Sequence, residues 1–101
     1  MNIARILAEA DGFDWDEGNV DKNWIKHLVS PVEAEEVFFN KPLLLISDEK
    51  HSDKEQRFVA MGKTDAGRLL FINWTSRKGK IRPISARPMN KKERKMYEQE
   101  A

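Results

Sequence analysis

The sequence predicts an α+β fold in which helices pack on one face of a small antiparallel sheet. Helix signals dominate residues 1–40, strand signals dominate residues 43–85, and one more helix signal follows. Short turns that contain glycine join the strand segments, and such turns connect strands that pair in an antiparallel sheet. Helices that precede an antiparallel meander cover its apolar face, which is the α+β arrangement.

Composition defines the class of protein. The chain has 101 residues, of which 40% are hydrophobic and 35% are charged, as in one folded domain. It contains no cysteine, and its histidines, His27 and His51, are too few for a closed zinc site, so we expect no metal and no cofactor. The start, MNIARILAEA, lacks the apolar core of a signal peptide, and residues 43–46 are too short to span a membrane. We therefore expect a cytoplasmic protein without a membrane partner.

Two helices are predicted near the N-terminus. Residues 1–10 have the pattern of a short amphipathic helix. Asp16 is a preferred N-cap residue, so a second helix is expected to run from there to about Leu28. Val20, Trp24 and Leu28 recur every four residues, and this spacing predicts that they form the buried stripe of the second helix.

The clearest helix start is the segment SPVE. Ser30 at the N-cap, Pro31 at the first helical position and Glu33 at the third form a capping box. The helix is expected to end at NKP, residues 40–42, because the residue before a proline disfavours helical geometry. Its buried side is expected to comprise Ala34, Val37 and Phe38.

Strand signals follow this helix. LLLIS, at residues 43–47, predicts a short buried strand, and DEKHSDKE after it predicts a polar loop. RFVAMGK at 57–63 and RLLFINWT at 68–75 are expected to form a hairpin across TDAG. KIRPIS at 80–85 follows across KG. Because Pro83 cannot donate to a ladder, this last strand is expected at the sheet edge, or with the missing donor facing outward.

A two-residue turn at Lys78–Gly79 sets the register of the last hairpin. The turn pairs Arg77 with Lys80. A slip by one residue would turn the arginines into the core at high cost, so the hydrophobic pattern supports this register. The next expected pairs are Thr75 with Arg82 and Asn73 with Ile84.

Alternation along these strands separates an apolar face from a cationic face. The same alternation places Arg87 on the core side near the end of its strand, where it could pair with an acidic residue. The core face is expected to hold Leu70, Ile72, Trp74 and Ile81. The cationic face is expected to hold Asn73, Thr75, Arg77, Lys80 and Arg82.

Basic residues concentrate in the second half of the chain. Residues 1–50 hold 5 basic and 11 acidic side chains, and residues 51–101 hold 13 basic and 6 acidic. Asn90 and Glu93 could cap a terminal helix through about Glu98, whose first turns are crowded with cations that the helix dipole disfavours. This clustering favours a phosphate-rich partner, and a basic sheet face with aromatic residues suits single-stranded RNA. The alternatives are a solvated face, or halves whose charges complement each other in the fold.

Three segments carry a resemblance to a known family: FDWDEGNVDKNWIKHLVSPVEAEEVFF, DEKHSDKEQRFVAMGKTDAGRLLF and WTSRKGKIRPISARPMNKKERKMYE. In order and spacing, residues 13–98 resemble the BrnT family of toxins from bacterial type II toxin–antitoxin pairs. The most specific pieces are KH at 26–27 before SxxEA, H…ExR at 51–57, and RxISAR at 82–87. Together these pieces cover nearly the whole chain.

The resemblance implies a RelE-like fold and a ribonuclease activity that stops translation. It also implies neutralisation by a ribbon-helix-helix antitoxin, through which alone the pair would bind operator DNA. Residues 1–101 would then form a single domain, with a helical extension at 1–12 and the toxin domain at 13–98. Leu28 departs from the family, in which glycine usually follows KH, and Pro88 stands where a second basic residue is frequent.

Cleavage of RNA without a metal needs a base for the 2′-hydroxyl, cationic donors for the phosphate and an acid for the leaving oxygen. By position and by resemblance, Arg57, Arg77 and Arg82 are the expected phosphate-holding groups, since guanidinium forks bind phosphate bidentately. Arg57 stacked on Trp74 in a structural role is an alternative. His27 is the candidate acid–base group, because histidine titrates near neutral pH, or it is a packed, partly buried histidine.

Two other polar residues, His51 and Glu55, are weaker candidates for the site. His51, in its polar loop, is expected to be exposed to solvent, and Glu55 could act as a base or pair with a neighbouring cation. The alternative function is a module that binds nucleic acid, or docks an acidic protein, through the same basic face without chemistry. The residues expected to hold RNA are Lys26, Lys80, Arg87, Lys91 and Lys92.

Overall fold

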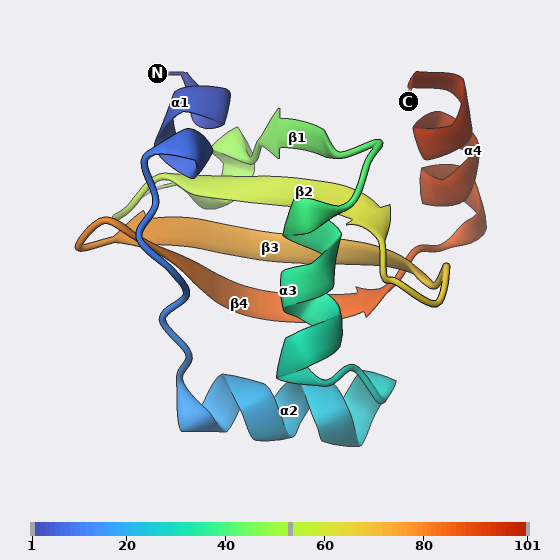
Figure 1. The fold of residues 1–101 in the computed structure, drawn as a ribbon, viewed down its shortest axis with the longest axis horizontal. Helices are drawn as coiled ribbons and strands as arrows, with labels where there is room; N and C mark the ends of the chain where they lie inside the picture. The colour runs from blue at the N-terminus through green and yellow to red at the C-terminus, as the bar shows by residue number, and fades with distance from the viewer. Residues whose placement is uncertain (1, 53, 101) are drawn as a thin grey trace.

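The structure, a computed structural model, describes residues 2–52 and 54–100 and confirms the α+β architecture (Figure 1). Its strands form one antiparallel sheet in the order β1-β2-β3-β4, so β4 lies at an edge, as Pro83 predicts. In chain order the elements are α1 (Ile3–Ala8), α2 (Glu17–His27), α3 (Pro31–Phe39), β1 (Leu44–Ser47), the 3₁₀ helix η1 (Glu49–His51), β2 (Arg57–Lys63), β3 (Leu69–Arg77), β4 (Lys80–Pro88) and α4 (Lys91–Glu100).

The helices cover the two faces of the sheet unequally. α3 crosses one face and packs on β2 and β3, while α2 runs beside β4 (Figure 1). α4 contributes Tyr97 to a smaller cluster with Val59 and Met61, whose side chains alternate with the core residues of β2. The second face of the sheet is therefore covered by α4 at one end only. No helix in the described part of the chain combines the length and the apolar character needed to cross a membrane.

The helix starts follow the local sequence. The hydroxyl of Ser30 accepts a hydrogen bond from the Glu33 N–H at 3.2 Å, and the Glu33 carboxylate accepts one from the Ser30 N–H at 3.1 Å. This reciprocal pair is the predicted capping box, with Pro31 in the first turn. Asp16 caps α2 through a 2.8 Å hydrogen bond from the N–H of Gly18. Both predicted caps are confirmed.

The predicted buried stripe of α2 is wrong. Trp24 is 53% exposed and Leu28 is 61% exposed, and Val20 is only half-buried. Among the α2 residues whose burial is described, Asn23 is buried, and its side-chain oxygen accepts a hydrogen bond from the Ala86 N–H at 3.1 Å. An edge strand leaves backbone donors that need a partner. The helix therefore docks on β4 through an amide rather than through the apolar residues that recur every four positions.

Leu28 ends α2 in the left-handed conformation, with φ at 53°. Its N–H and that of Val29 both reach the carbonyl of Asn23, which closes the helix end and turns Val29 into the core. Glycine is the residue that most often takes this conformation at a helix end. The glycine expected after KH from the resemblance would take this conformation readily, and in this chain Leu28 takes it.

The main core lies between the sheet and α3. Trp74, fully buried at its centre, contacts Phe38 edge to face with ring centroids 5.6 Å apart, and Phe58 at 4.8 Å. The predicted core face of β3 and β4 is confirmed, because its residues are among those with the least exposure. They are Leu70, Ile72, Trp74 and Ile81.

A bulge in β4 changes the predicted register. The pairs of Arg77 with Lys80 and of Thr75 with Arg82 are confirmed, but Asn73 pairs with Ser85, which leaves Ile84 as an extra residue. Pro83, next to the bulge, has no N–H for the ladder, and a bulge accommodates such a break. The extra residue reverses the alternation beyond it. Arg87, which pairs with Phe71, therefore lies on the cationic face and not on the predicted core side.

The N-terminal segment completes the edge of the sheet. The Ile81 N–H donates to the carbonyl of Gly12 at 3.0 Å, and the Asp14 N–H donates to the carbonyl of Ile81 at 2.8 Å. α1 packs its apolar side, including Ile6 and Leu7, against the main core. The segment expected as an extension, residues 1–12, thus contacts the rest of the domain over its described part.

Candidate functional site

The sheet face opposite α3 carries a row of polar and cationic side chains. Arg57 on β2 pairs with Thr75 on β3, which pairs with Arg82 on β4, so the three side chains share one face. Arg77 and Lys80 form the next row toward the hairpin tip. The predicted cationic face therefore exists, and it extends across β2 as well.

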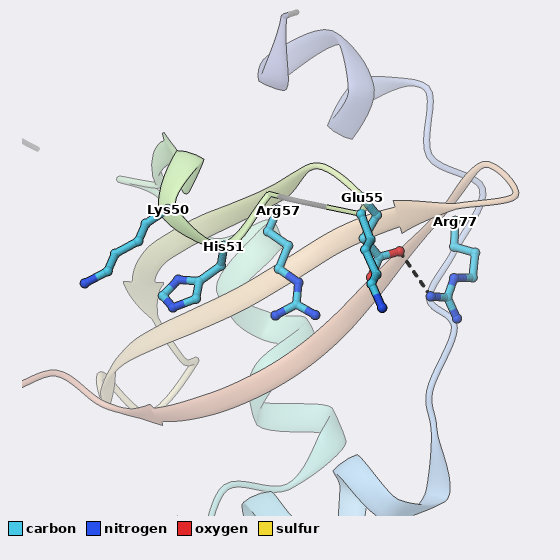
Figure 2. Close-up of a pocket in the computed structure, with 6 residues that line it drawn as sticks. Lys50, His51, Glu55, Arg57 and Arg77 are labelled. Atoms are coloured by element: carbon cyan, nitrogen blue, oxygen red, sulfur yellow. Dashed lines mark hydrogen bonds and ion pairs between the residues drawn. The ribbon is translucent and has the colours of Figure 1, made fainter.

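A groove of about 460 Å³ opens on this face, beside the loop that joins β1 to β2. Figure 2 shows the imidazole of His51 and the guanidinium of Arg57 extending side by side into the same space, with Arg77 further along. The groove therefore brings together side chains from η1, β2, β3 and the loop before β2. Its lining residues are Lys50, His51, Lys54, Glu55, Arg57 and Arg77.

Backbone and side-chain hydrogen bonds tie the loop of His51 to the strand of Arg57. The Arg57 N–H donates to the hydroxyl of Ser52 at 2.9 Å, and that hydroxyl donates to the carbonyl of Asp48 at 2.6 Å. The Asp48 N–H donates in turn to the carbonyl of Arg57 at 2.9 Å. These bonds hold the loop against the first residue of β2, and so they set the position of His51 relative to Arg57.

His51 lines the groove, although the candidate site expected from the sequence does not include it. It is exposed, as predicted, but its Nδ1 lies 3.0 Å from a carboxylate oxygen of Asp48 and its ring lines the groove. A carboxylate on Nδ1 orients the ring and leaves Nε2 for a ligand. The signal that could have found it is the spacing of Asp48 and His51, three residues apart, which puts the two side chains together on one helical turn.

Arg57 differs from the other arginines of this face. No carboxylate among the described residues forms an ion pair with it, and its Nε is buried without a hydrogen-bond partner in that part of the chain. Its guanidinium points into the groove (Figure 2). An arginine with unsatisfied donors at a groove is a ready ligand for an anionic oxygen.

Carboxylates hold the other arginines of the face. Arg77 pairs with Glu55 at 3.1 Å, as the dashed line in Figure 2 shows. Arg82 is largely buried between Asp14 at 3.1 Å and Asp16 at 3.0 Å. The partners of Arg82 come from the acidic N-terminal half of the chain. At Arg82, the charges of the two halves of the chain therefore complement each other in the fold, as the alternative interpretation expects.

His27 and Lys26 lie apart from this groove. The carbonyl of His27 accepts a hydrogen bond from the Arg68 guanidinium at 2.7 Å, so the end of α2 lies near the start of β3. Arg68 and Thr75 are seven residues apart along an extended chain, which corresponds to about 23 Å. Because Thr75 is the partner of Arg57, the structure does not bring His27 or Lys26 to the arginines of the groove.

The residues expected to hold RNA are spread over the molecule. Lys80, at the hairpin tip, donates to the carbonyl of Asp11 at 3.1 Å. Lys91 and Lys92 are exposed in the first turn of α4. Arg87 lies on the cationic face beside Phe71, with its guanidinium carbon 4.2 Å from the ring centroid. Of the sequence-predicted residues, the groove therefore unites Arg57 and Arg77, and Arg87 lies on the same face.

The start of α4 is joined to β4 by a two-pronged ion pair. Arg87 donates to both carboxylate oxygens of Glu93, at 2.7 and 2.8 Å. Asn90 and Glu93 also cap the helix reciprocally, as predicted. The hydrogen bonds from Arg87 hold the pKa of Glu93 below its ordinary value, against the opposing effect of burial, and the Asn90 N–H adds to the lowering.

We expect this pair to make the stability of the protein depend on pH. The pKa of Glu93 is lower in the folded than in the unfolded chain, so its stabilising effect is present above the unfolded value of about 4.3 and is lost as the pH falls through the folded value. Glu93→Gln should lower the free energy of unfolding by about 1–2 kcal/mol at pH 7, and much less at pH 2. Denaturant unfolding at the two pH values measures this, with Glu98→Gln as the exposed control. A difference that does not change with pH would contradict the expectation.

The described residues contain no evident metal centre. Across residues 2–52 and 54–100, no group of three or more His, Cys, Asp or Glu side chains is placed to hold a metal ion. The positive charges that face the groove belong to side chains, principally Arg57 and Arg77. Such a face is suited to a ligand that carries phosphate.

A helix-backed antiparallel sheet with a histidine and arginines on its open face is an arrangement suited to a phosphate-containing ligand. Residues 15–93 match a family model described as ribonuclease toxin, BrnT, of type II toxin–antitoxin system. The protein is therefore a ribonuclease toxin of a type II toxin–antitoxin system. It belongs to the BrnT family, as the resemblance indicated, and its family implies an RNA substrate and a cognate antitoxin.

The fold is similar to a solved structure of this family. The crystal structure of the Brucella abortus ribonuclease toxin, BrnT, aligns with a TM-score of 0.61 and 16% sequence identity over 79% of this chain and 97% of that chain. At this identity the likeness concerns the fold alone. No curated protein matches the chain.

Proposed function

We propose that this toxin cleaves single-stranded RNA in the groove between η1 and β2–β3, without a metal ion, and that this cleavage inhibits translation. The observation that carries the proposal is the placement of His51, oriented by Asp48, beside the guanidinium of Arg57, which forms no ion pair among the described residues. A base and a cationic phosphate ligand in one groove are the parts that attack by a 2′-hydroxyl requires.

In the proposed reaction, the ribose 2′-oxygen attacks the adjacent phosphorus. His51 takes the proton of the 2′-hydroxyl at Nε2, the bond from the 2′-oxygen to phosphorus forms, and the bond from phosphorus to the 5′-oxygen breaks. The leaving 5′-oxygen takes a proton from a cationic donor, for which the ammonium groups of Lys50 and Lys54 line the groove. The products are a 2′,3′-cyclic phosphate and a free 5′-hydroxyl, which balances the proton removed and the proton supplied.

The arginines supply the positive charge in this scheme. Negative charge grows on the non-bridging phosphate oxygens as the 2′-oxygen attacks, and a guanidinium fork contacts two oxygens at once. Arg57 is placed for this contact directly, and Arg77 can join it by exchanging Glu55 for phosphate. Arg82, held by Asp14 and Asp16, would support the site from the edge strand. These donors make the proposed reaction independent of a metal ion.

The proposed partner of the toxin is an antitoxin with a ribbon-helix-helix domain. Family membership implies a cognate antitoxin, and the resemblance of residues 13–98 supports this type of partner. Operator DNA would then be contacted by the antitoxin and not by the toxin.

Two histidines allow a matched test of the site. Purified protein is incubated with a long single-stranded RNA in EDTA, and the cleavage rate is compared for the native protein, His51→Ala and His27→Ala. We expect His51→Ala to lower the rate by about 10²- to 10⁴-fold, because it removes the base, and His27→Ala to stay within a fewfold of the native rate. Far-UV circular dichroism checks that both variants fold.

Each outcome of this test selects a function. Loss of cleavage in His27→Ala but not in His51→Ala would contradict the proposed site. Intact RNA with the native protein, in the presence of measurable binding, would favour the non-catalytic binding module that uses the same basic face. Cleavage that stops in EDTA and returns with a divalent cation would contradict the metal-independent reaction.

A further inference from the structure

A second hollow lies on the same sheet face, next to the groove. It has a volume of about 440 Å³. His51 lines both this hollow and the groove, and Asp48 lines this hollow. Ile46, Val59 and Asn73 form one cross-strand row in it, because Ile46 pairs with Val59 and Val59 pairs with Asn73. This row is two residues along β2 from Arg57, a distance of about 7 Å.

The floor of this hollow is apolar and its rim is polar. Val59 is buried, and Ile46 and Phe71 are half-buried around it. Asn73 follows Val59 in the same cross-strand row, and among the described residues its amide nitrogen makes one long hydrogen bond, 3.4 Å, to the hydroxyl of Ser85. At the far side Arg87 lies against the Phe71 ring. An apolar floor with a carboxamide beside it suits an aromatic heterocycle that is hydrogen-bonded along its edge.

Cationic groups bracket the apolar floor. Arg57 lies on one side of the row of Val59, and Arg87 lies on the other, in the row of Phe71. A nucleotide chain presents the matching sequence of groups, with a phosphate before and after each base. An acidic peptide would match the two cations, but it would fill the floor only if it also carried an aromatic side chain between its carboxylates. The charge pattern therefore favours a nucleotide over a protein segment.

We propose that this hollow binds the base of the nucleotide next to the cleaved phosphate, and that Asn73 makes the toxin selective for that base. The inference rests on the proposed ribonuclease function for the position of the phosphate. With the phosphate on Arg57 and His51, the adjacent base reaches the floor formed by Ile46, Val59 and Phe71. The amide of Asn73 then donates to and accepts from the base edge, as carboxamides do when they read bases.

The first measurement maps the cleavage sites on an RNA of random sequence. We expect the native protein to favour one base at one position beside the cut by about tenfold or more, the discrimination typical of a carboxamide bonded to a base edge. Asn73→Leu, which keeps the size and removes the amide, should lose most of this preference. Asn73→Asp, which replaces the donor by an acceptor, should change the preferred base. Lys54→Ala is the control, expected to lower the rate and to keep the preference.

The second measurement does not depend on cleavage. Dinucleotides with a 2′-deoxyribose lack the attacking hydroxyl, so they bind without being cut. We expect the backbone NMR signals of Phe71 and Asn73 to shift on titration, with an affinity that depends on the base and that loses this dependence in Asn73→Leu. Lys22→Ala, exposed on α2 away from this face, should bind as the native protein does.

The two measurements separate failure of this inference from failure of the proposed function. Native protein that cuts RNA with no base preference, or a preference that survives both Asn73 variants, would overturn the base site. If the native protein does not cut RNA, shifts at Phe71 and Asn73 that depend on the base would still support the site, and shifts confined to other regions would overturn it.

Discussion

Replacing Arg57 with alanine is expected to lower the rate of RNA cleavage by about 100- to 1,000-fold. Arg57 is the arginine of the groove whose guanidinium makes no ion pair within the described residues, and it stands beside His51. Its removal takes away a preorganised donor to the charge that develops on the phosphate. Its side-chain Nε has no hydrogen-bond partner among the described residues, so the substitution breaks no Nε hydrogen bond within them. Single-turnover cleavage of a short RNA measures the chemical step.

Two further variants sharpen this expectation. Arg57→Lys keeps the charge and loses the two-pronged contact, so its rate should lie between those of the native protein and the alanine variant. Arg5→Ala, on the exposed surface of α1, is the matched control and should cleave like the native protein. Equal rates for Arg57→Ala and Arg5→Ala would show that Arg57 does not contact the reacting phosphate.

Replacing Trp74 with alanine is expected to lower the free energy of unfolding by about 3–5 kcal/mol. Trp74 is fully buried and packs against Phe38 and Phe58, so its loss leaves a cavity between the sheet and α3. Domains of this size are stabilised by only about 5–15 kcal/mol in total, so the variant should unfold at a much lower denaturant concentration. Equilibrium unfolding in urea measures the change.

Trp24 provides the matched control for this effect. It is the same residue type on α2, but half of its surface faces solvent. Trp24→Ala should therefore change the free energy of unfolding by less than about 1 kcal/mol. Similar losses in the two variants would contradict the exposed position of Trp24 and would restore the buried stripe that the periodicity of α2 predicts.

The parts of the fold that were predictable depend on local chemistry. The capping box at Ser30 and the turn at Lys78–Gly79 are determined by neighbouring residues, and both appear as predicted. The bulge at Ile84 was not predictable in this way, because alternation assumes an unbroken ladder. The docking of α2 through Asn23 depends on a backbone donor of β4 that is 63 residues away in the sequence. Contacts of this kind are set by topology and not by periodicity.

In the candidate site, too, the local features were predictable and the contacts set by topology were not. The shared face of Arg77 and Arg82 follows from strand alternation, and it was expected. The carboxylates that hold Arg82 come from the N-terminal segment. Their contact with Arg82 was not predictable, because it depends on how the fold places that segment against β4. His51 belongs to a polar loop, for which the sequence predicts exposure but no position. Its place in the groove follows from the hydrogen bonds between that loop and Arg57.

The carboxylates that pair with Arg77, Arg82 and Arg87 act as counterions that are part of the protein itself. A bare cationic surface releases salt ions when a nucleic acid binds, and the entropy of their release drives the association. Glu55, Asp14, Asp16 and Glu93 already neutralise these guanidinium groups, and they stay attached to the chain when a ligand arrives. A polyanion therefore exchanges one anion for another at these arginines and gains little from its charge alone. Charge therefore favours binding mainly in the groove, where Arg57 forms no ion pair among the described residues. Elsewhere on this face, binding depends on groups that salt cannot imitate, namely the ribose hydroxyl and the bases.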